Sequence, residues 1–120
     1  MTKRILVAED DDDLRQTLAE ILELEGYEVD TAEDGQVALD KLRAGVPFDL
    51  MVLDLRMPRK SGHDVLHEIR DLPRLASLPI VVLTAETKNP PLGAVAWLRK
   101  PALPSLLLAV VSNYLRKGVK

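Results

Sequence analysis

Short apolar runs alternate with amphipathic stretches along almost the whole of this 120-residue chain. The apolar runs are rich in Ile, Leu and Val, whereas the stretches between them place apolar residues at helical spacing. This alternation is typical of βα units, in which parallel strands are buried beneath helices on both faces of a sheet. Because a chain of this length builds a single core, we expect one α/β domain over residues 1–120.

The pattern assigns an order of strands and helices. Strands are expected at residues 4–8, 27–31, 49–53, 79–84 and 95–98. Helices are expected at residues 12–24, 35–44, within 61–72 and at 104–117. The interval between Thr84 and Lys100 contains Pro90 and Pro91 and is too short for a regular crossover helix as well as a strand. The fourth helix is therefore expected to be shortened or absent.

Three of the expected strands end in residues that can carry chemistry. One apolar run leads into Asp54, another into Glu9 and Asp10, and a third into Thr84. The carboxyl ends of parallel strands meet at one edge of an open sheet, where such folds bind ligands. Carboxylates gathered there predict a small acidic metal pocket around one reactive aspartate, Asp54.

Composition excludes several classes of function. The net charge is −3 without a large basic cluster, and aromatic residues make up 3% of the chain, so this domain is not expected to bind nucleic acid. The absence of cysteine excludes thiolate metal sites and disulfides and fits a reducing compartment. The first apolar run is too short for a signal peptide or a membrane span, so we expect a cytoplasmic protein.

Four blocks of the chain resemble the signature blocks of receiver domains, the chemotaxis-regulator-like phosphoprotein modules of bacterial two-component response regulators. They are residues 5–11, residues 52–58 with Gly62, residues 82–85 and residues 100–101. The resemblance covers essentially the whole chain. It implies a flavodoxin-like, doubly wound sheet of five parallel strands in the order 2-1-3-4-5. It also implies phosphorelay signal transduction, in which a histidine kinase or phosphotransfer protein phosphorylates the domain with Mg²⁺ and so switches a partner-binding surface.

The resemblance gives roles to the acidic residues and their neighbours. Asp54 is expected to be the phosphoacceptor and a metal ligand. Asp10 is expected to bind Mg²⁺ directly, Glu9 to act through water, and Arg56 to offer its backbone carbonyl. The chemistry agrees, because a carboxylate attacks an anionic phosphoryl donor poorly unless a hard cation neutralises the charge between them.

The same resemblance gives roles to three further residues. Thr84 and Lys100 are expected to bind phosphoryl oxygens by charge-assisted hydrogen bonds. Thr84 and Trp97 are expected to act as the switch, Trp97 standing where the family has an aromatic residue. Transfer and hydrolysis would be self-catalysed and slow, so we expect a signalling module and not a metabolic enzyme.

Simpler explanations exist for single residues. Acidic residues also begin helices through capping and the helix dipole, which suffices for Asp12 and Asp13. Trp97 is as readily explained by packing. His63 and His67 lie one helical turn apart but have no third ligand nearby, so we expect them to be surface residues.

Two features of the chain bear on regulation. The last expected helix is apolar on nearly every side. If Leu103, Leu107, Val110 and Tyr114 face the sheet, another face is left with Leu108, Val111 and Leu115. Such a stripe is a candidate surface for a homodimer or for partner docking.

At the site rim, Arg56 and Glu86 could form a pair that shields the phosphorylated aspartate from water.

Two other functions remain open from the residues. One is an interaction module of the same fold whose output does not depend on phosphorylation. The other is a phosphohydrolase of the haloacid dehalogenase type, which also uses a strand-end aspartate. That class needs a second acid two residues after its nucleophile, and Arg56 stands there.

Overall fold

The structure, a computed structural model, describes residues 2–85 and 93–115. Five parallel strands form one sheet in the order β2-β1-β3-β4-β5. The strands are β1 (Arg4–Ala8), β2 (Glu28–Ala32), β3 (Leu50–Leu53), β4 (Ile80–Thr84) and β5 (Ala96–Arg99). This order confirms the predicted flavodoxin-like sheet.

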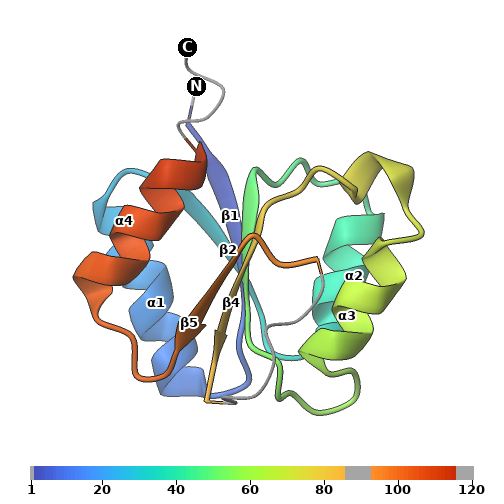
Figure 1. Cartoon of the computed structure of the whole chain (residues 1–120), viewed down its shortest axis with the longest axis horizontal. Helices are drawn as coiled ribbons and strands as arrows, with labels where there is room; N and C mark the ends of the chain where they lie inside the picture. Colours follow the sequence, from blue (N-terminus) through green and yellow to red (C-terminus); the bar gives the residue numbers. More distant parts are fainter. Residues whose placement is uncertain (1, 86–92, 116–120) are drawn as a thin grey trace.

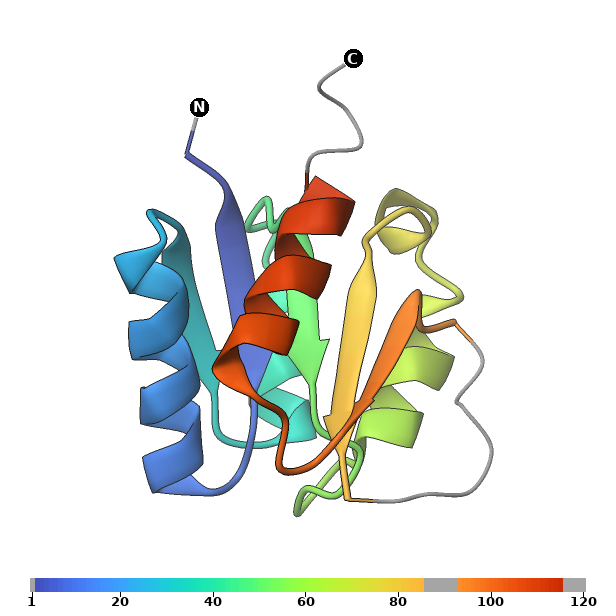
Figure 2. The same cartoon turned by 60° about the vertical axis from the view of Figure 1, so that its left-hand side comes forward.

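Helices cover both faces of the sheet. They are α1 (Asp12–Leu24), α2 (Gly35–Arg43), α3 (Gly62–Ile69) and α4 (Pro104–Leu115), with a short 3₁₀ turn, η1 (Pro73–Leu75). Figure 1 shows α1 and α4 on one side of the sheet and α2 and α3 on the other. Figure 2 shows β5 at the edge of the sheet, beyond β4, with α4 in front of the sheet. The fold is therefore doubly wound, as predicted.

The sheet is buried on both faces, which explains the uninterrupted apolar runs. Within β1, Ile5 and Val7 belong to the apolar cluster beneath α1 and α4, whereas Leu6 and Ala8 belong to the cluster beneath α2 and α3. All four side chains are essentially inaccessible to water. Removing apolar surface from water stabilises the fold by roughly 25 cal/mol per Å², so both faces contribute to holding β1 in place.

Polar residues begin the helices that follow β1, β2 and β3. Asp11, Asp34 and Ser61 are the N-cap residues of α1, α2 and α3, and each side chain accepts a hydrogen bond from a backbone N–H of the first turn. Ser61 and Asp64 complete a capping box. Because these caps lie beyond the carboxyl ends of the strands, they fix the ends of three loops at one edge of the sheet.

Four strands, β2, β3, β4 and β5, begin one residue later than predicted, and the hydrogen bonds of Tyr27 and Val95 account for two of these shifts. Tyr27 was expected in β2, but its N–H donates to the carbonyl of Leu22, so the residue closes the turn that follows α1. Val95 was expected in β5. Its N–H donates to the carbonyl of Ile80, but the residue precedes the strand and is 42% exposed. Local hydrogen bonds at the ends of elements, which apolar patterning does not encode, set these boundaries.

The crossover helix between Thr84 and Lys100, which was expected to be shortened or absent, would fall largely on residues 86–92, and these lie outside the described residues. The predicted end of the last helix at residue 117 lies outside them as well. The described residues on either side of that gap, 85 and 93–95, contain no helix. No helix in the described ranges combines the length and the apolarity needed to cross a bilayer.

Helix α4 packs on the sheet with a different stripe from the predicted one. Val111 and Leu115, which we expected on an outer face, are buried together with Leu107. Leu103, expected inside, is 68% exposed, and Leu106 is 48% exposed. Leu107 faces the sheet as predicted, and Val110 and Tyr114 pack partly buried against the apolar cluster beneath α1 and α4. The prediction was wrong for Leu103, Val111 and Leu115 because the helix is apolar on nearly every side, so its pattern did not select one face. The surface proposed for a homodimer therefore loses two of its three residues to the core.

The packing of α4 can be tested with two neighbouring leucines. Leu107→Ala removes a side chain that is 1% exposed and is expected to lower the free energy of unfolding by about 2–5 kcal/mol. Leu106→Ala truncates the half-exposed neighbour and is expected to cost less than about 1 kcal/mol. Urea denaturation followed by circular dichroism measures both. Equal losses would contradict this orientation of the helix.

Candidate functional site

The carboxyl ends of the central strands bring the predicted site residues to one edge of the sheet. Ala8 pairs with Leu53 in the parallel register, so Glu9 and Asp54, the next residues of β1 and β3, lie side by side. The N–H of Asp54 donates to the carbonyl of Ala8 at 3.0 Å. Thr84 ends β4 and Lys100 follows β5. In Figure 1 this edge is at the lower end of the strands.

Lys100 lies between the two buried carboxylates. Its Nζ is 2.7 Å from Oε1 of Glu9 and 3.3 Å from Oδ2 of Asp54. The two acidic side chains are only 2% and 5% exposed. The backbone N–H of Lys100 donates to the carbonyl of Thr84 at 2.8 Å, which anchors the lysine to the end of β4. The structure therefore brings Glu9, Asp54, Lys100 and Thr84 together.

Three carboxylates form a possible cation site. One oxygen from each of Glu9, Asp10 and Asp54 lies within 4.8 Å of the others, and Asp10 is exposed at the mouth of the group. Oε2 of Glu9 accepts from the N–H of Asp11 at 3.0 Å, but among the described residues buried Oε1 has only the Lys100 ammonium and no well-oriented hydrogen bond. A buried carboxylate oxygen in this state is costly, and a hard cation would satisfy it.

The electrostatics of the pocket favour added positive charge. Burial raises the pKa of Asp54 and of Glu9, and the nearby lysine offsets this only in part. Burial lowers the pKa of Lys100, but the close contact with the Glu9 carboxylate and the charge of Asp54 outweigh it and raise that pKa above its ordinary value. When ionised, three carboxylates face one ammonium, so two negative charges remain unbalanced. A divalent cation would match that excess.

The loop after Asp54 folds tightly against the site. The N–H of Arg56 donates to Oδ1 of Asp54 at 3.3 Å, and the N–H of Gly62 donates to the carbonyl of Leu55 at 2.9 Å. A Cβ on Gly62 would lie 2.3 Å from the carbonyl oxygen of Asp54, so only glycine fits there. Arg56 is thus placed beside Asp54 through its backbone, and its role as a carbonyl ligand stays a prediction.

Arg15 supports the site and was missed by sequence reasoning. It lies one turn into α1, and its Nη1 donates to the carbonyl of Glu9 at 2.9 Å and to that of Asp10 at 3.4 Å. The guanidinium therefore holds the backbone that carries two of the carboxylates. Its Nη2 also pairs with the carboxylate of Asp12 at 2.5 Å. Because an i, i+3 ion pair is common on solvated helix faces and the other partners are carbonyl groups, nothing in the sequence distinguishes this arginine.

Trp97 lies away from this cluster. It pairs with Val82 across β4 and β5 and packs, half-buried, against the apolar cluster beneath α2 and α3. Its role as a switch stays a prediction, as does that of Thr84, which is fully buried. Glu86, the predicted partner of Arg56, lies outside the described residues.

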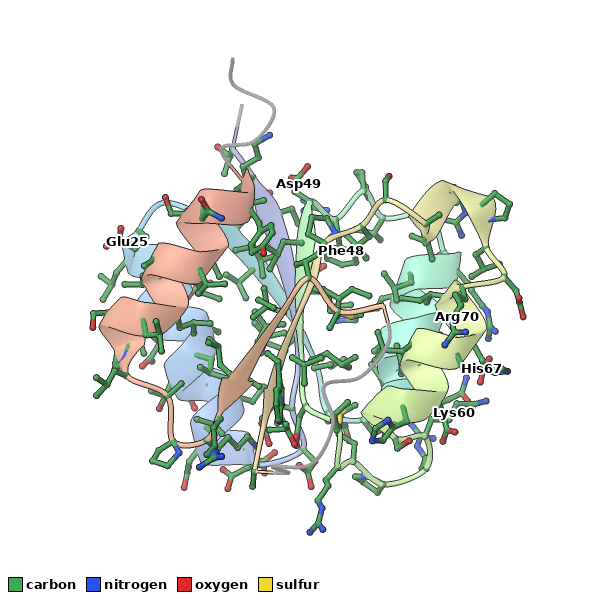
Figure 3. All side chains as sticks on the ribbon, viewed as in Figure 1. Glu25, Phe48, Asp49, Lys60, His67 and Arg70 are labelled. Atoms are coloured by element: carbon green, nitrogen blue, oxygen red, sulfur yellow. The ribbon has the colours of Figure 1, made fainter. Side chains whose placement is uncertain are left out.

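His63 and His67 are both exposed on α3, and His67 projects away from the sheet (Figure 3). Within the described ranges, they take part in no group of three potential metal ligands. This agrees with their expected place on the surface.

The raised pKa of Asp54 makes stability depend on pH with a definite sign. Folding is penalised once the pH exceeds the unfolded-state pKa, so the penalty is present at pH 7 and absent below about pH 4. Asp54→Asn is therefore expected to raise the free energy of unfolding at pH 7 in the presence of a chelator, with the gain shrinking toward pH 4. Urea denaturation at the two pH values measures it, with exposed Asp71→Asn as the control. A loss of stability at pH 7 would contradict the argument.

Comparison with known proteins agrees with this geometry. The chain matches the response regulator receiver domain over residues 5–112. It is 42% identical over 120 residues to the transcriptional regulatory protein PdtaR of Mycobacterium tuberculosis, covering 90% of this chain and 57% of that protein. It is 35% identical over 121 residues to the CpxR homolog of Haemophilus influenzae, covering 96% and 51%. The chain thus spans about half the length of these curated relatives.

Solved structures show the same fold. The chemotaxis response regulator CheY4 of Vibrio cholerae superposes with a TM-score of 0.86 at 32% identity, covering 95% of this chain and 99% of that one. The response regulator TrrA of Thermotoga maritima, solved in complex with Mg²⁺ and BeF, gives 0.84 at 38% identity, covering 94% and 99%. With strand order, strand-end carboxylates and family match in agreement, this chain belongs to the response regulator receiver domains.

Proposed function

We propose that this domain accepts a phosphoryl group on Asp54 in an Mg²⁺-dependent reaction and thereby switches a protein-binding surface. One observation carries the proposal. The buried carboxylate of Asp54 lies beside Glu9 and Asp10 and 3.3 Å from the ammonium of Lys100. A nucleophile, a site for a cation and a fixed positive charge therefore meet at one point, which is what transfer of an anionic group requires.

The residues present fit a magnesium ion. Glu9, Asp10 and Asp54 would supply carboxylate oxygens, and the backbone carbonyl of Arg56 would add a neutral one. Oxygen donors in a small, partly open group suit Mg²⁺, which keeps several of its waters. When bound, it would neutralise the charge between the carboxylate and the phosphoryl donor. The bound Mg²⁺ in the TrrA complex supports this assignment by likeness.

The chain's own groups then account for the transfer. An oxygen of Asp54 attacks phosphorus, a P–O bond forms, and the bond from phosphorus to the donor nitrogen breaks, leaving its electron pair on the imidazole of the donor histidine. Lys100 would hold a phosphoryl oxygen, and the Thr84 hydroxyl would turn toward another. The acyl phosphate carries about −1.5 to −2 charge where the carboxylate carried −1, and this extra charge at a buried position biases the elements around it between two arrangements.

The donor reaches Asp54 from an open hollow. This hollow, of about 600 Å³, lies beside the carboxylates and is lined by Asp10, Leu55, Arg56, Met57, Pro58, Ser61 and His63. We propose a histidine kinase or a phosphotransfer protein as the donor, in the cytoplasm. The catalysis would serve the domain's own modification, so the protein is a signalling phosphoprotein and not a metabolic enzyme.

Phosphorylation can be tested directly by intact mass. Incubation with acetyl phosphate and Mg²⁺ is expected to add one phosphoryl group to the parent protein, because the cation and Lys100 offset the repulsion between two anions. Asp54→Asn removes the nucleophile and is expected to add none. Exposed Asp71→Asn serves as the control and is expected to behave like the parent.

A chelator in place of Mg²⁺ should abolish the modification. A parent protein that gains no mass under these conditions would favour the same fold acting as an interaction module without phosphorylation.

The side chain of Arg56 offers a second test. It is exposed at the rim of the site, whereas the predicted metal ligand is its backbone carbonyl. Arg56→Ala is therefore expected to leave Mg²⁺ affinity nearly unchanged but to shorten the lifetime of the phosphorylated form, because water reaches it more easily. A change of about tenfold corresponds to about 1.4 kcal/mol in the barrier to hydrolysis. Loss of mass after donor removal measures the lifetime, and titration calorimetry measures the affinity.

Arg70→Ala, on the outer side of α3, is the matched control for Arg56→Ala (Figure 3). Equal lifetimes in the parent and the Arg56 variant would refute a shielding role for this side chain.

A further inference from the structure

Arg59 has an unusual backbone conformation in the loop between Asp54 and α3. Its φ is +64°, a left-handed conformation in which side chains crowd the following carbonyl and which non-glycine residues adopt infrequently. Among the described residues it is the one non-glycine residue with a positive φ. Such a conformation persists where surrounding contacts hold it, and these tend to gather at functional sites.

The contact that holds Arg59 is an ion pair to the neighbouring loop. Its Nε donates to Oδ2 of Asp34 at 2.8 Å, and the carboxylate of Asp34 is only 7% exposed. Oδ1 of Asp34 accepts from the N–H of Val37 at 2.9 Å and caps α2. The guanidinium holds the pKa of the Asp34 carboxyl below its usual range, so the pair is ionised at neutral pH. Arg59 is thereby tied to the start of α2.

A second tie lies next to the first. The N–H of Gly35 donates to the carbonyl of Lys60 at 3.1 Å, and a Cβ on Gly35 would lie 2.1 Å from that oxygen. The ammonium of Lys60 (Figure 3) forms an ion pair with the carboxylate of Glu68 on α3. The outer arm of the loop, residues 59 and 60, is therefore fastened to both α2 and α3.

The inner arm of the same loop, residues 55 and 56, follows Asp54 directly and lies at the proposed cation site. Arg56 donates its N–H to Asp54, and only Met57 and Pro58 separate it from Arg59. The ring of Pro58 restricts φ, which stiffens this short connection. A shift of Arg59 would consequently be transmitted to the carbonyl of Arg56.

We propose that Asp34 and Arg59 are positioning residues that hold the Arg56 carbonyl in place for the divalent cation. The inference rests on the proposed function, because it concerns the same metal site. Neither side chain needs to touch the cation. Their ion pair fixes the loop before the cation arrives, so that less of the binding free energy is spent on ordering it.

The decisive variant is Arg59→Gly. Glycine adopts the left-handed conformation without crowding, so the loop can still reach the same conformation, but the ion pair that holds it there is lost. Titration calorimetry with Mg²⁺ alone is expected to show a dissociation constant about tenfold higher, as for other residues that orient a metal ligand. The Mg²⁺ concentration that gives half-maximal phosphorylation should rise in parallel, whereas the rate at saturating Mg²⁺ should change little.

A second variant reaches the same contact from the other side. Asp34→Asn keeps an oxygen that can cap α2 but removes the charge that binds Arg59. It is expected to weaken Mg²⁺ binding by a similar factor, and the double variant should be no weaker than either single one. Arg4→Ala serves as the control, because it breaks an exposed pair with Glu28, 3.0 Å long, at the opposite end of the sheet.

Unchanged Mg²⁺ affinity in folded Arg59→Gly or Asp34→Asn would overturn the proposal, and so would effects that simply add in the double variant. The parent protein separates the two levels of inference. If the parent binds Mg²⁺ and is phosphorylated while the variants match it, the positioning role fails alone. If the parent itself does neither, the proposed function fails and the positioning role falls with it.

Discussion

The contact of the half-buried Lys100 ammonium with both Glu9 and Asp54 is the interaction on which the site depends. Isolated carboxylates at this depth would lose most of their hydration, and burial already raises the pKa of both. The lysine keeps them close enough to act together, but it balances only part of their charge. The pocket therefore keeps an excess of negative charge that a positively charged ligand can balance. The same unbalanced negative charge that lowers the stability of the free protein raises its affinity for a cation.

The scaffold makes this concentration of charge tolerable. The central strands β1, β3 and β4 are buried on both faces and apolar along almost their whole length, so the polar residues gather where these strands end. Three helix caps and the close approaches at Gly35 and Gly62 then lock the loops over that edge. The same topology that fills the core thus decides where chemistry can occur.

The sequence predicted this arrangement well where a residue's role is local to its strand. Apolar runs located the strands, and the residues that follow them located Glu9, Asp54 and Thr84 at one edge. It failed for α4, because a helix that is apolar all round does not reveal which stripe meets the sheet. It also missed Arg15 and the pairing of Arg59 with Asp34, whose partners are a carbonyl or a residue far along the chain. Contacts of that kind depend on the tertiary fold and leave no periodic trace.

The single tryptophan of the chain has a practical consequence. Its indole is half-buried beside β4, and its buried Nε1 finds no hydrogen-bond acceptor among the described residues. All tryptophan emission from this protein originates at that one place on the edge strand. The chain therefore contains an intrinsic optical probe, separate from the carboxylates, whose colour and intensity follow the solvation of this edge strand without any added dye.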